Sequence, residues 1–497
     1  MKQLNFIFLC IITFFLIFIF LGAPQIFNWD EGMWSTISKE MAQTHDFLTL
    51  QFLGQPYFLK PPLYFWSTNL AYKMFGISEF SARFFSALFG VLTILLLYWM
   101  GKTFYSKRVA SLASYFLLSS ILFVASAKIG LLDTALIFFS FLAIFGLFVF
   151  MEKRKNWGAY LAYFSLGLAF LSKGPLAVVL ILAALILQCL FERSAKIFLQ
   201  AWHLKAAVIG SLIPLLWFIG NLARHGYLFF EQFIIYNHFY RYVNTIMNDE
   251  PIYYYLVIFI LGFMPLSFFF YDVLASFFKK KIAPDRLSSF LFFYIIFAFI
   301  IFSFGKDNAP GYILPAFPAY AILLARYFDH LIGNPSKKIL GFFLVLFLGL
   351  IFILAASYVK YLNLKEYALP LQVLFYICGS MNILSFILFL RQKIYLSISS
   401  LITGQIISIL ILCAWILPIY EKFDHPPIKQ AALFINQQKA GEVIAFRMEF
   451  FPSLNFYLNS PVKNSKTRVI IAEKNNLKEI STKNKRTQAF GNFIVVY

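Results

Sequence analysis

Long apolar runs separated by short polar connections fill most of this chain. Because about 17 to 25 apolar residues cross a bilayer, the pattern predicts about thirteen membrane-spanning helices. They are expected near residues 4–23, 83–101, 109–127, 131–150, 157–172, 174–191, 204–221, 252–275, 288–304, 311–328, 338–356, 368–390 and 396–417. The predicted fold class is therefore a membrane all-α domain over residues 1–418, with a helical first outer loop at 24–82.

The pattern changes after residue 418, where the apolar runs shorten to the length of strands. Runs at Glu442 to Phe450, Arg468 to Ala472 and Phe493 to Tyr497 predict strands, and Pro426 to Ala440 predicts a helix. We therefore expect residues 419–497 to form a small α/β domain outside the membrane.

Basic residues indicate which connections face the cytoplasm. Alternate short loops carry basic clusters, and the positive-inside rule places such loops, together with the N-terminus, inside. These clusters contain Lys102, Lys107, Arg108, Lys153, Arg154, Lys155, Arg193, Lys196, Lys205, Lys279, Lys280, Lys281, Arg286, Arg326, Lys337, Lys338, Arg391 and Lys393. Loops 24–82, 222–251 and 305–310 then share the outer compartment with the tail.

Composition supports an integral membrane protein. The 497 residues are 61% hydrophobic and 13% charged, whereas about a quarter of the residues of soluble proteins are charged. The net charge of +20 does not indicate nucleic-acid binding, because the basic residues punctuate apolar segments instead of clustering on one soluble face. The four cysteines all lie inside apolar runs, so neither a disulfide framework nor a cysteine metal site is indicated.

The first outer loop concentrates acidic, basic and aromatic residues. Asn28 is expected to cap a helix that runs to about Gln43 and carries Asp30 and Glu31 in its first turn, where backbone N–H groups favour carboxylates. The segment Gln55 to Pro62 cannot be helical because its prolines favour extended backbone, so Lys60 is held in a rigid turn. The alternative interpretation is a solvated surface helix with an interfacial aromatic belt.

Further ionisable residues lie near membrane depth, where charges are costly and usually functional. Asp133 begins the fourth predicted span, and Lys173 lies between the fifth and sixth spans at the same face. Simpler interpretations are an acid that complements a helix dipole and a lysine that extends to the interface.

The other two outer loops add more candidate groups. His238 and Arg241 stand three residues apart, so a helix places them on one face, where Arg suits a phosphate-bearing headgroup. An interfacial helix explains the same segment. Lys306 and Tyr312 bracket a turn-rich loop and add a cation and a phenol.

These residues share one chemical theme. Lys60, Arg241, Lys306 and Lys173 are cations able to hold a phosphate, while Asp30 and Asp133 are able to accept a proton. Transfer of a sugar from a lipid phosphate needs both functions. The sequence contains no phosphate-binding glycine loop, HExxH helix or GxSxG elbow, so it does not support NTP hydrolysis, zinc proteolysis or serine hydrolysis of that type.

The ordered set of motifs resembles the polytopic GT-C glycosyltransferases, especially the lipid A aminoarabinose transferases and, more distantly, the protein O-mannosyltransferases. The motifs are Asp30-Glu31, Ser38 to Met41, Gly54 to Pro62, Leu131 to Thr134, Lys173-Gly174, His238 with Arg241, and Tyr312 to Pro315. They cover about the first 330 residues.

The resemblance implies roles for several residues. Asp30 and Asp133 correspond to the paired acidic residues of the site, and Tyr57, Lys60, Arg241 and Tyr312 correspond to the pocket that grips the lipid phosphate. The aminoarabinose enzymes carry Glu before the loop lysine and Arg-Tyr after the first aspartate. Here Leu59, Met33 and Trp34 stand at those positions, so no metal ion is indicated, and a divalent ion stays an open question.

The resulting hypothesis is a glycosyltransferase of the bacterial inner membrane whose active site faces the periplasm. It would take a polyprenyl-phosphate sugar as donor and lipid A, another envelope glycan or lipid, or a protein as acceptor. The alternatives are a transporter or flippase of lipid-linked sugars, for which charges on both sides and repeated halves would be expected, and a purely structural role.

Overall fold

The computed structural model describes residues 2–244, 250–279, 285–306, 308–336, 339–423, 427–437, 443–446, 452–459, 469–473, 487–490 and 493–496. Within them the chain is mostly helical. The elements of the first half are α1 (Lys2–Phe18), α2 (Asp30–Thr44), β1 (Gln51–Phe52), β2 (Gln55–Pro56), α3 (Leu63–Phe75), α4 (Glu79–Phe104), α5 (Lys107–Leu118), α6 (Ile121–Lys128), α7 (Asp133–Lys153), α8 (Asn156–Lys173), α9 (Leu176–Glu192), α10 (Lys196–Ala201), α11 (Leu204–His225), α12 (Tyr227–Phe230), the π-helix η1 (Glu231–Tyr240) and α13 (Arg241–Val243).

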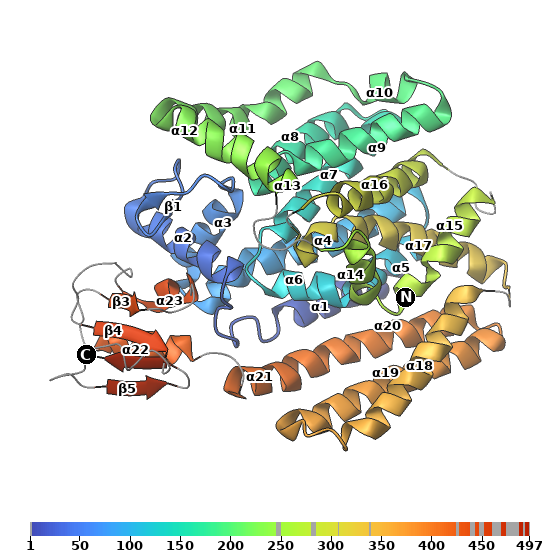
Figure 1. Ribbon diagram of the computed structural model, residues 1–497. Helices are drawn as coiled ribbons and strands as arrows, with labels where there is room; N and C mark the ends of the chain where they lie inside the picture. The colour runs from blue at the N-terminus through green and yellow to red at the C-terminus, as the bar shows by residue number, and fades with distance from the viewer. Residues whose placement is uncertain are drawn as a thin grey trace.

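The second half continues the bundle and ends in the tail. Its elements are α14 (Tyr254–Gly262), η2 (Leu266–Phe269), α15 (Phe270–Phe278), α16 (Arg286–Ser303), η3 (Pro310–Ile313), α17 (Ala316–Gly333), α18 (Leu340–Val359), η4 (Lys365–Tyr367), α19 (Ala368–Leu390), α20 (Ile394–Ile411), η5 (Leu412–Ile416), α21 (Leu417–Phe423), α22 (Ile428–Gln437), β3 (Val443–Phe446), α23 (Pro452–Tyr457), β4 (Val469–Glu473), β5 (Thr487–Phe490) and β6 (Phe493–Val496). Figure 1 shows α18, α19 and α20 together along one side of the bundle.

Helices occupy the positions of the predicted spans, but fewer of them qualify as membrane crossings. Among the described residues, seven helices are long and apolar enough to cross a membrane, or up to nine if each of two bent pairs is one span. The two pairs correspond to the spans expected at 109–127 and 252–275, and they bend by 66° and 115°. In the second pair Pro265 lies at the break, where a residue without an N–H interrupts the helical hydrogen bonds.

The largest apolar core lies among α4, α5, α7, α16 and α17. Helix α17 is buried along most of its length, with Phe317, Tyr320, Leu324 and Phe328 all at 0% exposure. Because lipid tails are as apolar as these side chains, close packing between helices contributes much of their association. Helix α17 therefore lies inside this core, packed on several sides by other helices.

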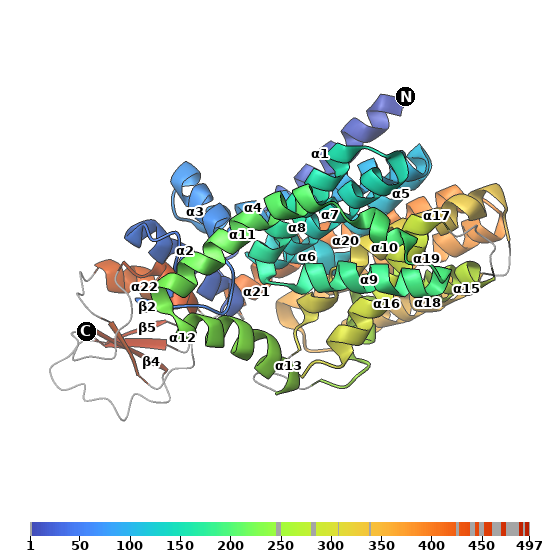
Figure 2. The ribbon, with the colours of Figure 1, turned by 90° about the horizontal axis from the view of Figure 1, so that it is seen from above.

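The tail contains helices and strands that lie beside α2, at the end of the molecule away from the N-terminus (Figures 1 and 2). Its four described strands form one sheet in the order β3-β4-β6-β5, in which β3 and β4 are parallel and the other pairs are antiparallel. Helix α22 and strands β3, β4 and β6 overlap the ranges expected for one helix and three strands, and the remaining ends of those ranges lie outside the described residues. Strand β5 and helix α23 were not expected, because both segments are short and mix polar with apolar residues.

The start of α2 differs from the expected capping. Asn28 does not cap the helix; the residue before the helix is Trp29, with φ 63°, and no side chain caps the N-terminus. Instead, Asn28 Oδ1 accepts a hydrogen bond from the Ser453 hydroxyl at 3.2 Å. The side chain that was expected to satisfy its own helix is therefore used by the tail, a contact between residues 425 positions apart.

Candidate active site

A small hairpin positions the lysine-bearing segment of the first loop. Leu53 and Gly54 both have positive φ, as the two central residues of a tight hairpin turn require, and they join β1 to β2. The Glu40 carboxylate accepts hydrogen bonds from both turn N–H groups, at 2.8 and 3.1 Å. Helix α2 therefore holds the turn, and the extended chain that follows delivers Tyr57 and Lys60 to the site.

Three loops and two helix ends meet at one cavity of about 260 Å³, which we call the cationic cavity. It is lined by Lys60, Lys173, Pro175, Leu176, Val179, Asn237, His238, Arg241, Tyr242, Ile301, Phe302, Gly305 and Tyr312. Lys60, Lys173, His238, Arg241 and Tyr312 were all expected at the site. The structure brings them together from segments more than 250 residues apart in the sequence.

Asp133 forms an ion pair with Lys173, with 2.6 Å between Oδ1 and Nζ and both side chains largely buried. The Lys173 ammonium also lies 4.6 Å from the centre of the Tyr312 ring, a cation–π distance. A side chain at Gly311 would contact the Asp133 carboxylate at 3.4 Å, so η3 packs closely over it. Asp133 thus orients a cavity lysine and compensates its charge.

Asp30 is the first residue of α2 and its side chain is exposed. The surrounding protein still removes part of its solvation and raises the pKa of its carboxyl, while the charges of Lys60 and Lys173 oppose that shift. A carboxylate of raised pKa beside cations is suited to accept a proton.

Burial and the neighbouring cations Arg241 and Lys173 lower the pKa of Lys60 to about 7. Burial, Lys60 and Arg241 lower the pKa of His238 to about 4, so this imidazole is neutral at physiological pH. Its Nε2 is buried without a hydrogen-bond partner, and the ring lies against Gly174, where a Cβ atom would meet it at 2.8 Å. The cavity is therefore rich in cationic groups and also contains one neutral imidazole.

Two of the expected site residues lie elsewhere. Glu31 is 1% exposed and forms a two-point ion pair with Arg83, so its carboxylate is enclosed away from the cationic cavity. Lys306 is exposed and does not line that cavity; its backbone N–H donates to the Tyr242 carbonyl at 3.0 Å. Both remain candidates by sequence, but the structure gives them other contacts.

The residue that sequence reasoning missed is Arg83. It stands at the first position of a predicted span, and its guanidinium donates to Glu31 and to the carbonyls of Leu21, Pro24 and Gln25. A charge at the edge of an apolar run was the available signal. Within the described residues no group of three or more His, Cys, Asp or Glu side chains is arranged to hold a metal ion.

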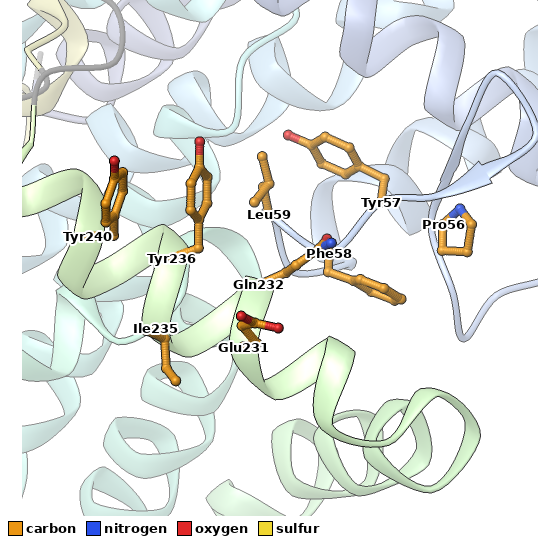
Figure 3. A pocket seen from close by; sticks show the side chains of 9 residues that line it. All are labelled: Pro56, Tyr57, Phe58, Leu59, Glu231, Gln232, Ile235, Tyr236 and Tyr240. Carbon is orange, nitrogen blue, oxygen red and sulfur yellow. The ribbon is translucent and has the colours of Figure 1, made fainter.

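A second cavity, of about 540 Å³, adjoins the first, and we call it the tyrosine cavity. Figure 3 shows its lining residues, which come from the first loop and from η1. They are Pro56, Tyr57, Phe58, Leu59, Glu231, Gln232, Ile235, Tyr236 and Tyr240. Tyr57 belongs to this lining and also lies within electrostatic range of Asp30, Arg241 and Tyr312, so the tyrosine cavity and the cationic cavity are neighbours.

Comparison with known proteins places this architecture in a family. The family described as dolichyl-phosphate-mannose-protein mannosyltransferase matches residues 59–219. An uncharacterized protein of Aquifex aeolicus is 31% identical over 71% of this chain and 68% of its own length. An undecaprenyl phosphate-alpha-4-amino-4-deoxy-L-arabinose arabinosyl transferase of Edwardsiella ictaluri is 28% identical over 65% of this chain and 60% of its own length. The chain belongs to the GT-C glycosyltransferase superfamily.

The GT-C fold extends over the whole molecule. The crystal structure of ArnT from Cupriavidus metallidurans bound to undecaprenyl phosphate has a TM-score of 0.85 at 21% identity, over 99% of this chain and 97% of that chain. This likeness shows the fold, and with it a multi-pass membrane protein. By sequence, the matches span 60% to 68% of the two curated relatives described above.

Proposed function

We propose that this GT-C glycosyltransferase moves a sugar from a polyprenyl-phosphate donor to an acceptor on the outer side of the membrane. One observation carries the proposal: Lys60, Lys173, Arg241 and Tyr312 line one cavity beside Asp30. Cations that surround an open space are suited to an anionic group, and the adjacent carboxylate is suited to accept a proton.

The cationic cavity has two kinds of wall, and both fit the proposed donor. Lys60 and Arg241 with the Tyr312 hydroxyl suit the phosphate, and Tyr57 lies close enough to contribute its own hydroxyl. Leu176, Val179, Ile301 and Phe302 form an apolar wall on α9 and α16, helices of the membrane bundle, which suits the polyprenyl chain. The names of the arabinosyl transferase relatives specify undecaprenyl phosphate, which agrees with this division.

The reaction follows from these positions. Asp30 takes the proton of the acceptor hydroxyl, and the acceptor oxygen forms a bond to the anomeric carbon of the donor sugar. The bond between that carbon and the phosphate oxygen breaks, and its electron pair stays on the phosphate. Lys60 and Arg241 stabilise the charge that develops there, and the Asp133–Lys173 pair supplies a third, oriented cation.

The orientation and acceptor belong to the same proposal. The loops that form the site are those with few basic residues, whereas the alternate connections carry the basic clusters, which supports a periplasmic site in a bacterial inner membrane. The proposal also includes the thirteen membrane-spanning helices and the extracytoplasmic tail that the sequence predicts. Lipid A or another envelope glycan or lipid is the proposed acceptor class, by analogy with the arabinosyl transferases.

The test is a donor-consumption assay on the purified full chain in lipid nanodiscs. The protein is incubated with a panel of undecaprenyl-phosphate sugars and with lipid A, a glycolipid or an unfolded peptide as acceptor. We expect release of undecaprenyl phosphate with one donor and a mass increase on one acceptor. Modification of the peptide alone would instead identify a protein glycosyltransferase. Absence of donor consumption across the panel, in protein that fails to bind undecaprenyl phosphate, would refute the proposal.

A further inference from the structure

One helix separates the two cavities. Glu231, Gln232, Ile235, Tyr236 and Tyr240 of η1 face the tyrosine cavity, whereas Asn237 and His238 of the same helix, with Arg241 just after it, face the cationic cavity. The two faces of one helix thus line different cavities, and π-helical turns are frequent at functional sites. Opposite η1, residues 56–59 line one cavity and Lys60 lines the other. Helix η1 and the segment 56–60 therefore each contribute to the lining of both cavities.

The walls differ in charge. Among the described residues that line the tyrosine cavity, Glu231 is the only one with a charged side chain, and it is an acid. The cationic cavity is lined by Lys60, Lys173 and Arg241. A phosphate is attracted to the second cavity and repelled by the first. Substrates with different charges are therefore expected on the two sides of η1.

The shape of the tyrosine cavity favours a flat, partly polar ligand. The Tyr236 and Tyr240 rings are stacked, with centroids 5.3 Å apart and an angle of 13°, and both side chains are more than a third exposed (Figure 3). A sugar ring has C–H faces of slight positive charge, which pack on the negative face of an aromatic ring. Glu231, Gln232 and the tyrosine hydroxyls add acceptors and donors for sugar hydroxyls.

We infer that the tyrosine cavity is the acceptor site and that it binds an uncharged or amine-bearing saccharide ring, which narrows the proposed acceptor class to envelope glycans and glycolipids whose accepting ring carries no phosphate. The inference rests on the proposed glycosyl transfer and adds the chemical class of its acceptor. The acceptor hydroxyl enters the reaction beside Tyr57, which lines this cavity and lies in electrostatic range of both Asp30 and Arg241. A polyprenyl chain fits this cavity poorly, because Glu231, Gln232 and the tyrosine hydroxyls would lose hydration without gaining partners.

The test measures binding of small sugars to the full chain in nanodiscs by saturation-transfer NMR, which detects weak ligands. The probes are methyl glucoside, methyl glucosaminide and glucose 1-phosphate, and undecaprenyl phosphate is measured in parallel. We expect both glycosides to bind. We expect glucose 1-phosphate to be displaced by undecaprenyl phosphate, because it occupies the cationic cavity.

Two sets of variants separate the cavities. Tyr236→Ala or Tyr240→Ala is expected to weaken glycoside binding about tenfold and leave undecaprenyl phosphate binding unchanged, and Tyr236→Phe is expected to retain the glycosides. Lys60→Ala is expected to weaken undecaprenyl phosphate binding and to leave glycoside binding unchanged. Glu231→Lys is expected to let glucose 1-phosphate bind in the tyrosine cavity, where undecaprenyl phosphate does not displace it.

The outcomes distinguish a failure of the acceptor inference from a failure of the proposed function. If wild-type protein binds undecaprenyl phosphate but no glycoside, or if the tyrosine variants bind glycosides normally, the acceptor inference is wrong and the proposed function stands. If undecaprenyl phosphate itself does not bind, the proposed function fails first. Binding of maltose from solution is compared with binding of a glucolipid in the nanodisc, which shows whether the saccharide is taken from solution or from the membrane. Binding of either ligand that is weakened in the Tyr236 and Tyr240 variants supports the inference.

Discussion

Glu31 and Arg83 form an enclosed ion pair, in which Nε and Nη2 of the arginine lie 2.6 and 2.9 Å from the two carboxylate oxygens. The Phe27 and Gly130 N–H groups donate to the same carboxylate, both at 2.7 Å. The pair joins α2 to α4 and to the segment before α7. Asp30, the neighbouring residue, is exposed beside the cavities, so one acidic dipeptide provides both an anchor and a candidate base.

Breaking the Glu31–Arg83 ion pair is predicted to lower the stability of the fold strongly. Arg83→Met leaves the Glu31 carboxylate buried without its counter-charge, and we expect a loss of about 3–5 kcal/mol in the free energy of unfolding. Thermal unfolding of the protein in detergent measures this effect. The double variant Glu31→Gln/Arg83→Met should be more stable than the sum of the two single changes indicates, because it leaves no buried charge. Simple additivity would contradict the pairing.

Asp30 is predicted to be the general base. Asp30→Asn retains the size of the side chain and removes the proton acceptor, so single-turnover rates should fall by about 10²–10⁴-fold while donor binding persists. Asp133→Asn is the matched comparison, because it leaves Lys173 without its ion-pair partner and should change donor binding as well as rate. Near-normal turnover of well-folded Asp30→Asn would remove Asp30 from this role.

Lys60 predicts a pH dependence of donor binding. The charged groups that act on it are Arg241, Lys173, Asp30 and Asp133, and the His238 ring lies in the same cavity. With a pKa of about 7, Lys60 is about half protonated in the free protein at neutral pH. A bound phosphate favours the charged form and raises that pKa. The complex therefore holds more protons than the free protein, and affinity must fall as pH rises above about 7.

Undecaprenyl phosphate affinity measured between about pH 7 and 9 tests this dependence. The loss should approach, but not exceed, tenfold per pH unit. Lys60→Arg is the control, because its guanidinium stays charged throughout this range and should give a flatter profile. His238 does not contribute to this pH dependence, because its pKa of about 4 keeps the imidazole neutral between pH 7 and 9. An affinity that rises with pH would show that Lys60 is not the titrating contact.

Docking of the tail on α2 is predicted to support activity. A Cβ atom at Gly32 would lie 2.5 Å from the Ser453 backbone nitrogen, and Lys39 Nζ donates to the carbonyls of Phe456 and Leu458 at 2.9 and 2.5 Å. We expect Gly32→Ala to cost about 1–3 kcal/mol through overpacking and to displace α23 from the helix that carries Asp30.

Limited proteolysis of the tail and turnover of the same samples measure that displacement. Lys39→Met should give the same direction of change by removing the donor to the α23 carbonyls. Gln43→Ala, an exposed change on α2, is the control and should leave both readouts unchanged. Faster cleavage without loss of turnover would show that the tail is dispensable for the site.

The sequence by itself determined the class of the protein and indicated which residues carry the candidate chemistry. Runs of apolar residues have few ways to avoid water other than spanning helices, and the basic loops predict which side of the membrane each connection faces. It also singled out charged residues in the loops and at one span end, among them Asp30, Lys60, Arg241 and Asp133. These conclusions depend on local composition, which a single sequence contains.

Only the tertiary structure decided what each charge contacts. Asp30 and Glu31 are adjacent and chemically alike, but successive residues of a helix point about 100° apart, so one borders the cavities and the other meets Arg83, 52 residues away. Asn28 serves the tail instead of its own helix because Ser453 reaches it across 425 residues. The division of η1 into an acidic, aromatic face and a basic face likewise depends on what packs opposite each side. Partners brought together by packing of distant segments leave no periodic trace in the local sequence.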